Sequence, residues 1–257
     1  MLRASTPVFL AFFLMTSALL RAEGPALEYR VTDIEGPAGI IPKNSKNASP
    51  AVAGLMLLPG DRLITGVKGR VELASKAGTV IELKEKASLI VEMLGEASST
   101  FFLKKGRLFA RFASLKKRVG SPYRIKTPVM VASVRGTELG VSVKEDGETD
   151  AGVVEGTVGF TSLDKPEAEE VVVEKSQGVH AAPHEAIAKL PEIPKPILDS
   201  IDTFQHIRDR VPQLRDEWKD LDKPSQMKMR QDALRERVKW EVPEKLDIKK
   251  PAPPPKP

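Results

Sequence analysis

The chain has 257 residues, of which 41% are hydrophobic and 29% are charged. This composition excludes a largely disordered chain and supplies enough apolar material for one sizeable core or two small ones. The formal net charge of +5 is too small to name a class of partner, and the absence of cysteine excludes both a disulfide framework and a lipid-anchored cysteine.

The first 22 residues have the pattern of a secretory signal peptide. Arg3 gives a positive start, an apolar run follows, and the small residue Ala22 precedes Glu23. The apolar run is shorter than the roughly 20 residues that a helix needs to cross a bilayer. We expect cleavage before Glu23, no remaining transmembrane span, and a periplasmic or secreted protein of the bacterial cell envelope. An uncleaved anchor is the alternative.

Residues 28–179 are expected to form a mainly β domain, because short alternating apolar runs are interrupted by Gly, Pro and polar clusters. Apolar residues also recur at a spacing of ten: Leu63, Leu73, Leu83, Met93 and Leu103 in one series, and Val71, Ile81 and Val91 in another. This spacing predicts many short strands, arranged either as a sandwich or as a small β-solenoid.

The segment between Glu96 and Glu138 contains ten basic residues and no acidic residue. Within it, the period of two places Arg107, Phe109 and Arg111 on one face of a strand, which we expect to be exposed and basic. Together with Arg135, these residues are the candidate binding site for an anionic partner. Alternatively, the basic side chains meet acids of neighbouring strands, among them Glu72, Glu82 and Glu92.

Thr127–Val141 is predicted to be a strand, a turn and a second strand. The residue before Pro128 favours an extended conformation, and Gly136 is expected to have a positive φ angle at the turn. Ser133 has no neighbouring histidine or acid in the sequence to activate it as a nucleophile. Capture of an anion by Arg135 and the backbone amides near Gly136 is the alternative.

A Pro-rich linker is expected at 180–195, a helical region at 196–241 and a disordered Pro/Lys tail at 242–257. The helical region carries a coiled-coil-like seam made of two series with seven-residue spacing: Ile197, Phe204, Val211 and Trp218, and Ile207, Leu214 and Leu221. Pro212 and Pro224 are expected to divide it into two or three helices. The seam either covers the β domain or pairs with a partner helix, including one from a second copy of the chain.

The sequence shows no pattern that specifies catalysis, a cofactor or a metal. The phosphate-loop, dinucleotide and nucleophile-elbow motifs are absent. His180 and His184 are four residues apart, but Pro183 lies between them, so they do not form a helical zinc pair. We expect a non-enzymatic protein without cofactors, and export makes nucleic acid an improbable partner.

Several short motifs follow one another in an order that resembles the FecR domain family, from about Leu57 to Ser162. The most specific lie in LLPGDRLITG, TPVMVASVRGT and GVVEGTVGF. The residues matching the family pattern are expected to be structural: Gly60, Asp61, Thr65, Gly66, Thr127, Pro128, Gly136, Thr137, Glu155 and Gly156.

The resemblance implies an exported all-β domain that binds and signals without chemistry. The family's namesake places this domain behind a cytoplasmic segment that controls a sigma factor, whereas here only the expected signal peptide precedes it. We therefore expect a binding or interaction module whose partner is an envelope protein. Two alternatives remain: a structural component that binds an anionic envelope polymer or the cell wall, and an envelope hydrolase.

Overall fold

The computed structural model describes residues 28–95, 98–114, 123–221 and 232. The expected signal peptide at 1–22 and the expected tail at 242–257 lie outside these residues. The described part contains sixteen strands and two helices, so the prediction of a mainly β fold is confirmed. Within the same residues, no helix combines the length and the apolar character needed to cross a membrane.

The strands form two sheets that share one long strand, β8 (Ser99–Arg111). The first sheet has the order β1 (Tyr29–Glu35), β5 (Arg70–Ser75), β6 (Val80–Leu83), the second half of β8, β11 (Glu138–Val143), β12 (Thr149–Glu155), β15 (Gly178–Ala181) and β16 (Ala188–Leu190). The second sheet has the order β3 (Ser49–Pro50), β2 (Ala38–Ile41), β4 (Arg62–Thr65), β7 (Ser88–Leu94), the first half of β8, β9 (Tyr123–Lys126), β10 (Met130–Val134), β13 (Thr157–Ser162) and β14 (Val171–Glu174).

Strand β8 passes from the second sheet to the first at Gly106. Its residues 99–105 pair with β7, whereas residues 108–111 pair with β6. Gly106 has a φ angle of +89°, and a Cβ atom there would lie 2.4 Å from the Cα atom of Ala87. Both the backbone angle and the close approach therefore require glycine at this crossing.

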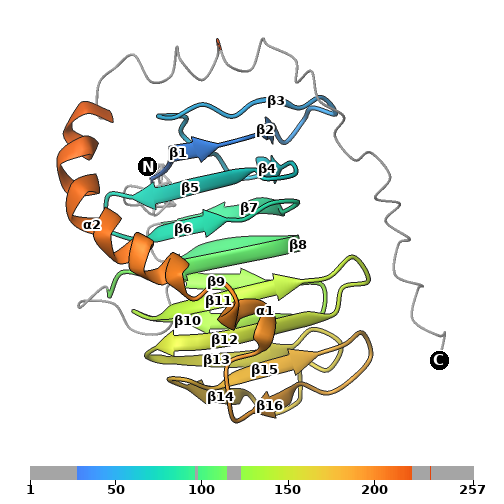
Figure 1. The fold of residues 1–257 in the computed structure, drawn as a ribbon. Helices are drawn as coiled ribbons and strands as arrows, with labels where there is room; N and C mark the ends of the chain where they lie inside the picture. Colours follow the sequence, from blue (N-terminus) through green and yellow to red (C-terminus); the bar gives the residue numbers. More distant parts are fainter. Residues whose placement is uncertain (1–27, 96–97, 115–122, 222–231, 233–257) are drawn as a thin grey trace, which may run out of the picture.

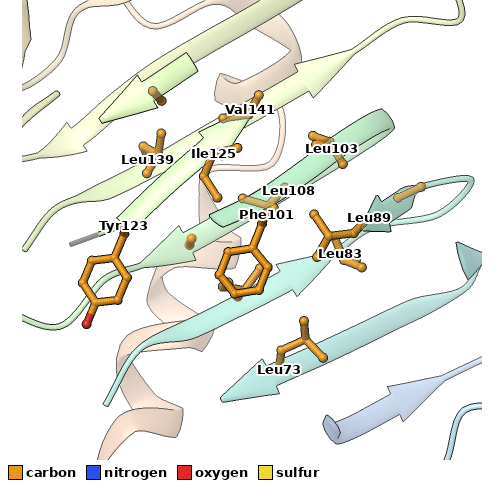
Figure 2. Packing of buried hydrophobic residues seen from close by; sticks show 14 of the residues in the cluster. Leu73, Leu83, Leu89, Phe101, Leu103, Leu108, Tyr123, Ile125, Leu139 and Val141 are labelled. Carbon is orange, nitrogen blue, oxygen red and sulfur yellow. The ribbon is translucent and has the colours of Figure 1, made fainter. Parts of the chain in front are cut away.

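The main core lies between the two sheets, which makes the domain a β-sandwich (Figure 2). In the ten-residue series Leu63, Leu73, Leu83 and Leu103 are fully buried, as the spacing predicted. Met93 is the exception and is 40% exposed. The pairing of β7 with β8 shifts between Val91 and Met93, so this side chain turns away from the core.

Two helices, α1 (Lys195–Leu198) and α2 (Asp202–Leu221), pack on the outer face of the first sheet (Figure 1). The seam contacts this sheet through buried apolar side chains: Ile197, Phe204, Ile207, Leu214 and Trp218. The interpretation that the seam covers the β domain is thus confirmed for the described residues. This part of the seam is not free to pair with another chain.

The expected break at Pro212 does not occur, because α2 continues through it to Leu221. Proline removes the helical hydrogen bond to the carbonyl of Arg208. Packing of Ile207 before Pro212 and of Leu214 after it against the sheet holds the helical course despite this loss. Tertiary contacts therefore override the local signal.

The segment 180–195, expected to be a linker, includes the end of β15 and the strand β16, and its last residues are docked on the first sheet. Gly140, Gly152 and Gly178 lie opposite one another on β11, β12 and β15. A Cβ atom at Gly152 would lie 2.7 Å from the Cγ2 atom of Ile193, and one at Gly178 would lie 2.4 Å from the Cδ atom of Pro194. Because these glycines have no side chains, the segment that leads into α1 can lie directly against the sheet.

The burial pattern of the ten-residue series predicts unequal costs of truncation. Leu73→Ala and Leu83→Ala should each lower the free energy of unfolding by about 2 to 5 kcal/mol, because each leaves a cavity between the sheets. Met93→Ala belongs to the same series but is exposed, and it should be nearly neutral. Urea denaturation of the three variants measures this, and equal losses at all three positions would contradict the assignment of the core.

Candidate ligand-binding face

Three carboxylates are buried on the outer face of the first sheet. Glu72 on β5, Glu82 on β6 and Glu138 on β11 are at most 3% exposed. Glu72 and Glu82 lie directly opposite each other on neighbouring strands, so their like charges repel. Buried carboxylates require charge partners, since an uncompensated charge loses its hydration on burial.

Helix α2 supplies a hydrogen-bonding side chain for each of these carboxylates, and Glu82 also forms an ion pair with the neighbouring Lys84 at 2.6 Å. His206 lies with its Nδ1 atom 3.1 Å from Glu82, Arg208 donates to Glu138 through Nε at 3.1 Å, and Arg210 donates to Glu72 through Nη2 at 3.1 Å. The hydrogen bond to Glu138 raises the pKa of Arg208. Hydrogen bonds to Glu217 and then to Glu72 raise the pKa of Arg210 above its usual range.

The helix also covers most of the candidate site that the sequence indicated. Arg107, Phe109 and Arg111 do share one face of β8, but Phe109 is fully buried and forms an edge-to-face contact with Phe204 of α2. Arg107 donates to the Oγ atom of Ser200 at 2.9 Å, and Arg111 lies 3.3 Å from Glu138. Arg135, at the turn after β10, is exposed. The face expected to be exposed is therefore mainly a helix-docking surface.

The outer face of the second sheet carries a different part of the basic segment. Strand β9 places Tyr123 and Ile125 in the core, so Arg124 and Lys126 point outward. Two rows of outward residues run across the strands in register. One row contains Arg62, Ile90, Phe102, Lys126, Val131 and Thr161, and the other contains Met93, Thr100, Arg124, Ser133, Gly159 and Val172.

A groove of about 560 Å³ lies across the middle of these two rows. It is lined by Glu92, Met93, Thr100, Arg124, Lys126, Val131, Ser133 and Thr161. Glu92 accepts a hydrogen bond from Lys126 at 2.9 Å. Arg124 is exposed and makes no ion pair within the described ranges. The sequence pointed to this segment, but it did not single out Arg124 or Lys126.

The residues that match the family pattern lie mainly at turns. Gly136 has the predicted positive φ angle, at +63°. The buried side chain of Thr137 packs against the position where Gly156 lacks a side chain, with the Thr137 Cγ2 atom 2.6 Å from the place that a Cβ would take. Gly60 and Gly156 also have positive φ angles. These residues shape the connections between the sheets.

Side-chain hydrogen bonds stabilise the other turns of this set. Asp61 accepts from the backbone N–H of Leu58 at 2.8 Å, and Thr65 accepts from that of Ala87 at 2.8 Å. Thr127 accepts from the backbone N–H of Met130 at 3.1 Å across the turn that contains Pro128. Gly66 donates its N–H to the carbonyl of Pro37 at 2.8 Å. These contacts connect each motif residue to the backbone of a neighbouring turn or strand.

A second pocket, of about 380 Å³, lies beside the turn at Gly136. Glu138 and Glu155 line this pocket together with Arg111. Arg111 and Arg208 are already paired with Glu138. The carboxylates repel an anion, so the geometry does not favour the alternative in which this turn captures one.

One group of potential metal ligands occurs in the described residues: Glu148, Asp150 and His180. His180 Nδ1 lies 2.9 Å from Asp150, its direct cross-strand neighbour. Glu148 accepts a hydrogen bond from Lys144, and this contact raises the pKa of Lys144. Lys144 and His180 thus already contact these carboxylates, and His184 lies apart from the cluster beside Asp164.

The fold and its two outer faces define a β-sandwich module with one face covered by its own helix and one that the described residues leave uncovered. The family model described as FecR protein matches residues 61–159, and the chain thus contains a FecR domain. The match begins at the turn before β4 and ends within β13, so both helices lie outside it.

No curated protein matches the chain. Among solved structures, two crystal structures of a candidate anti-sigma factor from Parabacteroides distasonis ATCC 8503, at 1.65 and 2.50 Å, are similar to it. Each is 12% identical, with a TM-score of 0.46, and the similarity covers 55% of this chain and 64% of the other. The chain therefore spans less than two thirds of the length of those proteins.

The buried ion pairs predict that α2 is sensitive to loss of a single charge. Arg210→Ala should lower the free energy of unfolding by about 3 kcal/mol, since it leaves the buried carboxylate of Glu72 without its helix partner. Adding Glu72→Gln to Arg210→Ala should recover part of this loss. Lys195→Ala removes an exposed cation that pairs with Asp199, and it should change stability by less than about 1 kcal/mol. Denaturant unfolding measures all three, and equal effects of the two cation removals would contradict the prediction.

The turn at Gly136 and the neighbouring strand predict unequal losses of stability for two substitutions. Gly136→Val should lower the free energy of unfolding by about 1 to 3 kcal/mol, because a branched side chain is strained at a φ angle of +63°. Ser133→Ala should be mild, because this side chain stands on the outer face of β10. Thermal unfolding of the two variants provides the measurement, and the reverse ranking would reopen a chemical role for Ser133.

Proposed function

We propose that this protein is a non-enzymatic, exported binding module of the FecR type, which acts in the bacterial periplasm or cell envelope. Its partner is an envelope protein, bound through the outer face of the second sheet. The signal-peptide pattern supports export, and the FecR domain supports a regulatory or signalling role.

The observation that carries this proposal is the difference between the two outer faces. On the outer face of the first sheet, charged and apolar side chains contact α1 and α2 of the same chain. On the second sheet, the described residues leave a groove with an exposed arginine at its centre. A binding module needs an accessible face of this kind on a rigid scaffold.

The positions of the polar side chains support a role without catalysis. Ser133 has Arg124 and Gly159 as its cross-strand neighbours, and neither residue can act as its general base at neutral pH. His180 and His206 lie against carboxylates on the outer face of the first sheet, away from the groove. The groove is thus suited to recognition by charge and shape.

The test is affinity capture from an envelope extract with the full chain as bait. Ser133→Trp places a bulky side chain in the groove, whereas Gln205→Trp makes the same change on the exposed side of α2. A defined protein should be captured by the unchanged chain and by Gln205→Trp, and Ser133→Trp should lose it. Circular dichroism of both variants checks that the fold is retained.

Each other outcome counts against the proposal. Capture that is equal for the two tryptophan variants would show that the groove is not the binding face. Recovery of cell-wall polysaccharide in place of a protein would favour the structural alternative. Turnover of an envelope component that Ser133→Trp abolishes would favour a hydrolase.

A further inference from the structure

The two cations of the groove have a spacing that an extended peptide can match. Arg124 and Lys126 stand two residues apart on β9 and point to the same side, so their attachment points are about 7 Å apart. Side chains at alternate positions of any extended chain have this same separation. A segment lying along β9 could thus place one carboxylate at each cation.

The surroundings of these cations add to the positive potential. Lys104 stands on the outward side of β8, because Phe101 and Leu103 point into the core. Its pKa is lowered first by burial and then by the nearby charges of Arg62 and Lys105. Positive charges thus crowd one another on this part of the face, and a bound carboxylate would relieve that repulsion.

The acids on this face belong to the chain itself and mark the limits of the groove. Glu92 is bound to Lys126, and both side chains are one third exposed, so an incoming carboxylate can exchange with it. At the other end, the side chain of Glu170 lies over Gly159, where a Cβ atom would be 1.9 Å from its Oε1 atom.

Apolar side chains flank the two cations on neighbouring strands. Val131 is the direct neighbour of Lys126 on β10, and Met93 begins the row that contains Arg124. Phe102 lies next to Lys126 on β8 and is partly accessible. Val131 and Met93 offer apolar surface to the methylene groups of an acidic side chain whose carboxylate reaches a cation.

We propose that the groove on the second sheet binds an extended acidic segment of a partner protein, with carboxylates at alternate positions that pair with Arg124 and Lys126. This inference rests on the proposed function, since it names the chemistry of the partner at the same face. Charge attraction guides the encounter, and the alternate spacing selects among acidic segments.

The experiment measures fluorescence anisotropy of labelled seven-residue peptides with the full chain. The first, alternating peptide has two glutamates separated by one serine, with serine at all remaining positions. The second, block peptide has the same composition but its two glutamates are adjacent, so that they point to opposite sides of an extended chain. The third has Gln in place of Glu. The alternating peptide should bind about tenfold more tightly than the block peptide, and the Gln peptide should not bind measurably. Raising the salt concentration from about 0.02 to about 0.5 M should weaken binding.

Two double variants test the assignment of the cations. Arg124→Gln with Lys126→Gln should weaken binding of the alternating peptide by about tenfold or more. Lys175→Gln with Lys189→Gln removes the same charge from exposed positions on other elements, and it should leave affinity unchanged within about twofold. Circular dichroism and thermal unfolding show whether either variant has altered the fold.

The inference can be overturned while the proposed function stands. Equal binding of the alternating and block peptides would refute the spacing, and tighter binding of polygalacturonate than of any peptide would refute a protein partner in favour of an anionic polymer. Absence of binding by every probe would refute the acidic ligand. In that case, capture of an envelope protein that depends on Ser133 would still support the binding face.

Discussion

The pairing of buried carboxylates on the first sheet with cations of α2 is the constraint on which the arrangement of the molecule depends. Glu72 and Glu82 face each other on adjacent strands with almost no exposure, an arrangement that would be unfavourable without positive partners. Arg208 and Arg210 provide such partners for Glu138 and Glu72 from a segment more than sixty residues later in the chain. Glu82 pairs with Lys84 and contacts His206 of the helix. The helix is therefore integral to this face and not an appendage.

The basic segment contributes side chains to two different faces of the molecule. Because β8 crosses from one sheet to the other at Gly106, Lys104 stands on the outer face of the second sheet and Arg107 on that of the first. Arg107 is then engaged by the connection between the helices, whereas β9 adds Arg124 and Lys126 to the uncovered face. The basic segment thus contributes to the helix-docking surface on the first sheet and to the candidate binding groove on the second.

The segment that leads into α1, together with Ile197 of that helix, explains why three glycines lie side by side on the first sheet. Gly140, Gly152 and Gly178 form a row in which any side chain would meet Ile193, Pro194 or Ile197. The row lies beside Phe109, whose ring packs on Phe204. The glycine row holds the chain that precedes α2, and the contact of Phe109 with Phe204 holds the first turn of the helix. The ion pairs of Arg208 and Arg210 hold the turn that follows. The groove on the opposite face consequently belongs to a rigid scaffold.

The sequence by itself determined the local features: strands from alternation, the buried leucines from the ten-residue spacing, the turn at Gly136, and an apolar seam at helical spacing. These follow from the period of two or of 3.6 and from the steric demands of glycine. Only the tertiary structure decided that Met93 leaves the core, that α2 continues through Pro212, and that Phe109 lies under the helix while Arg124 stays exposed. The alternation within a strand says which residues share a face, but it does not say what covers that face. That is set by contacts between residues far apart in the chain, such as Glu72 with Arg210.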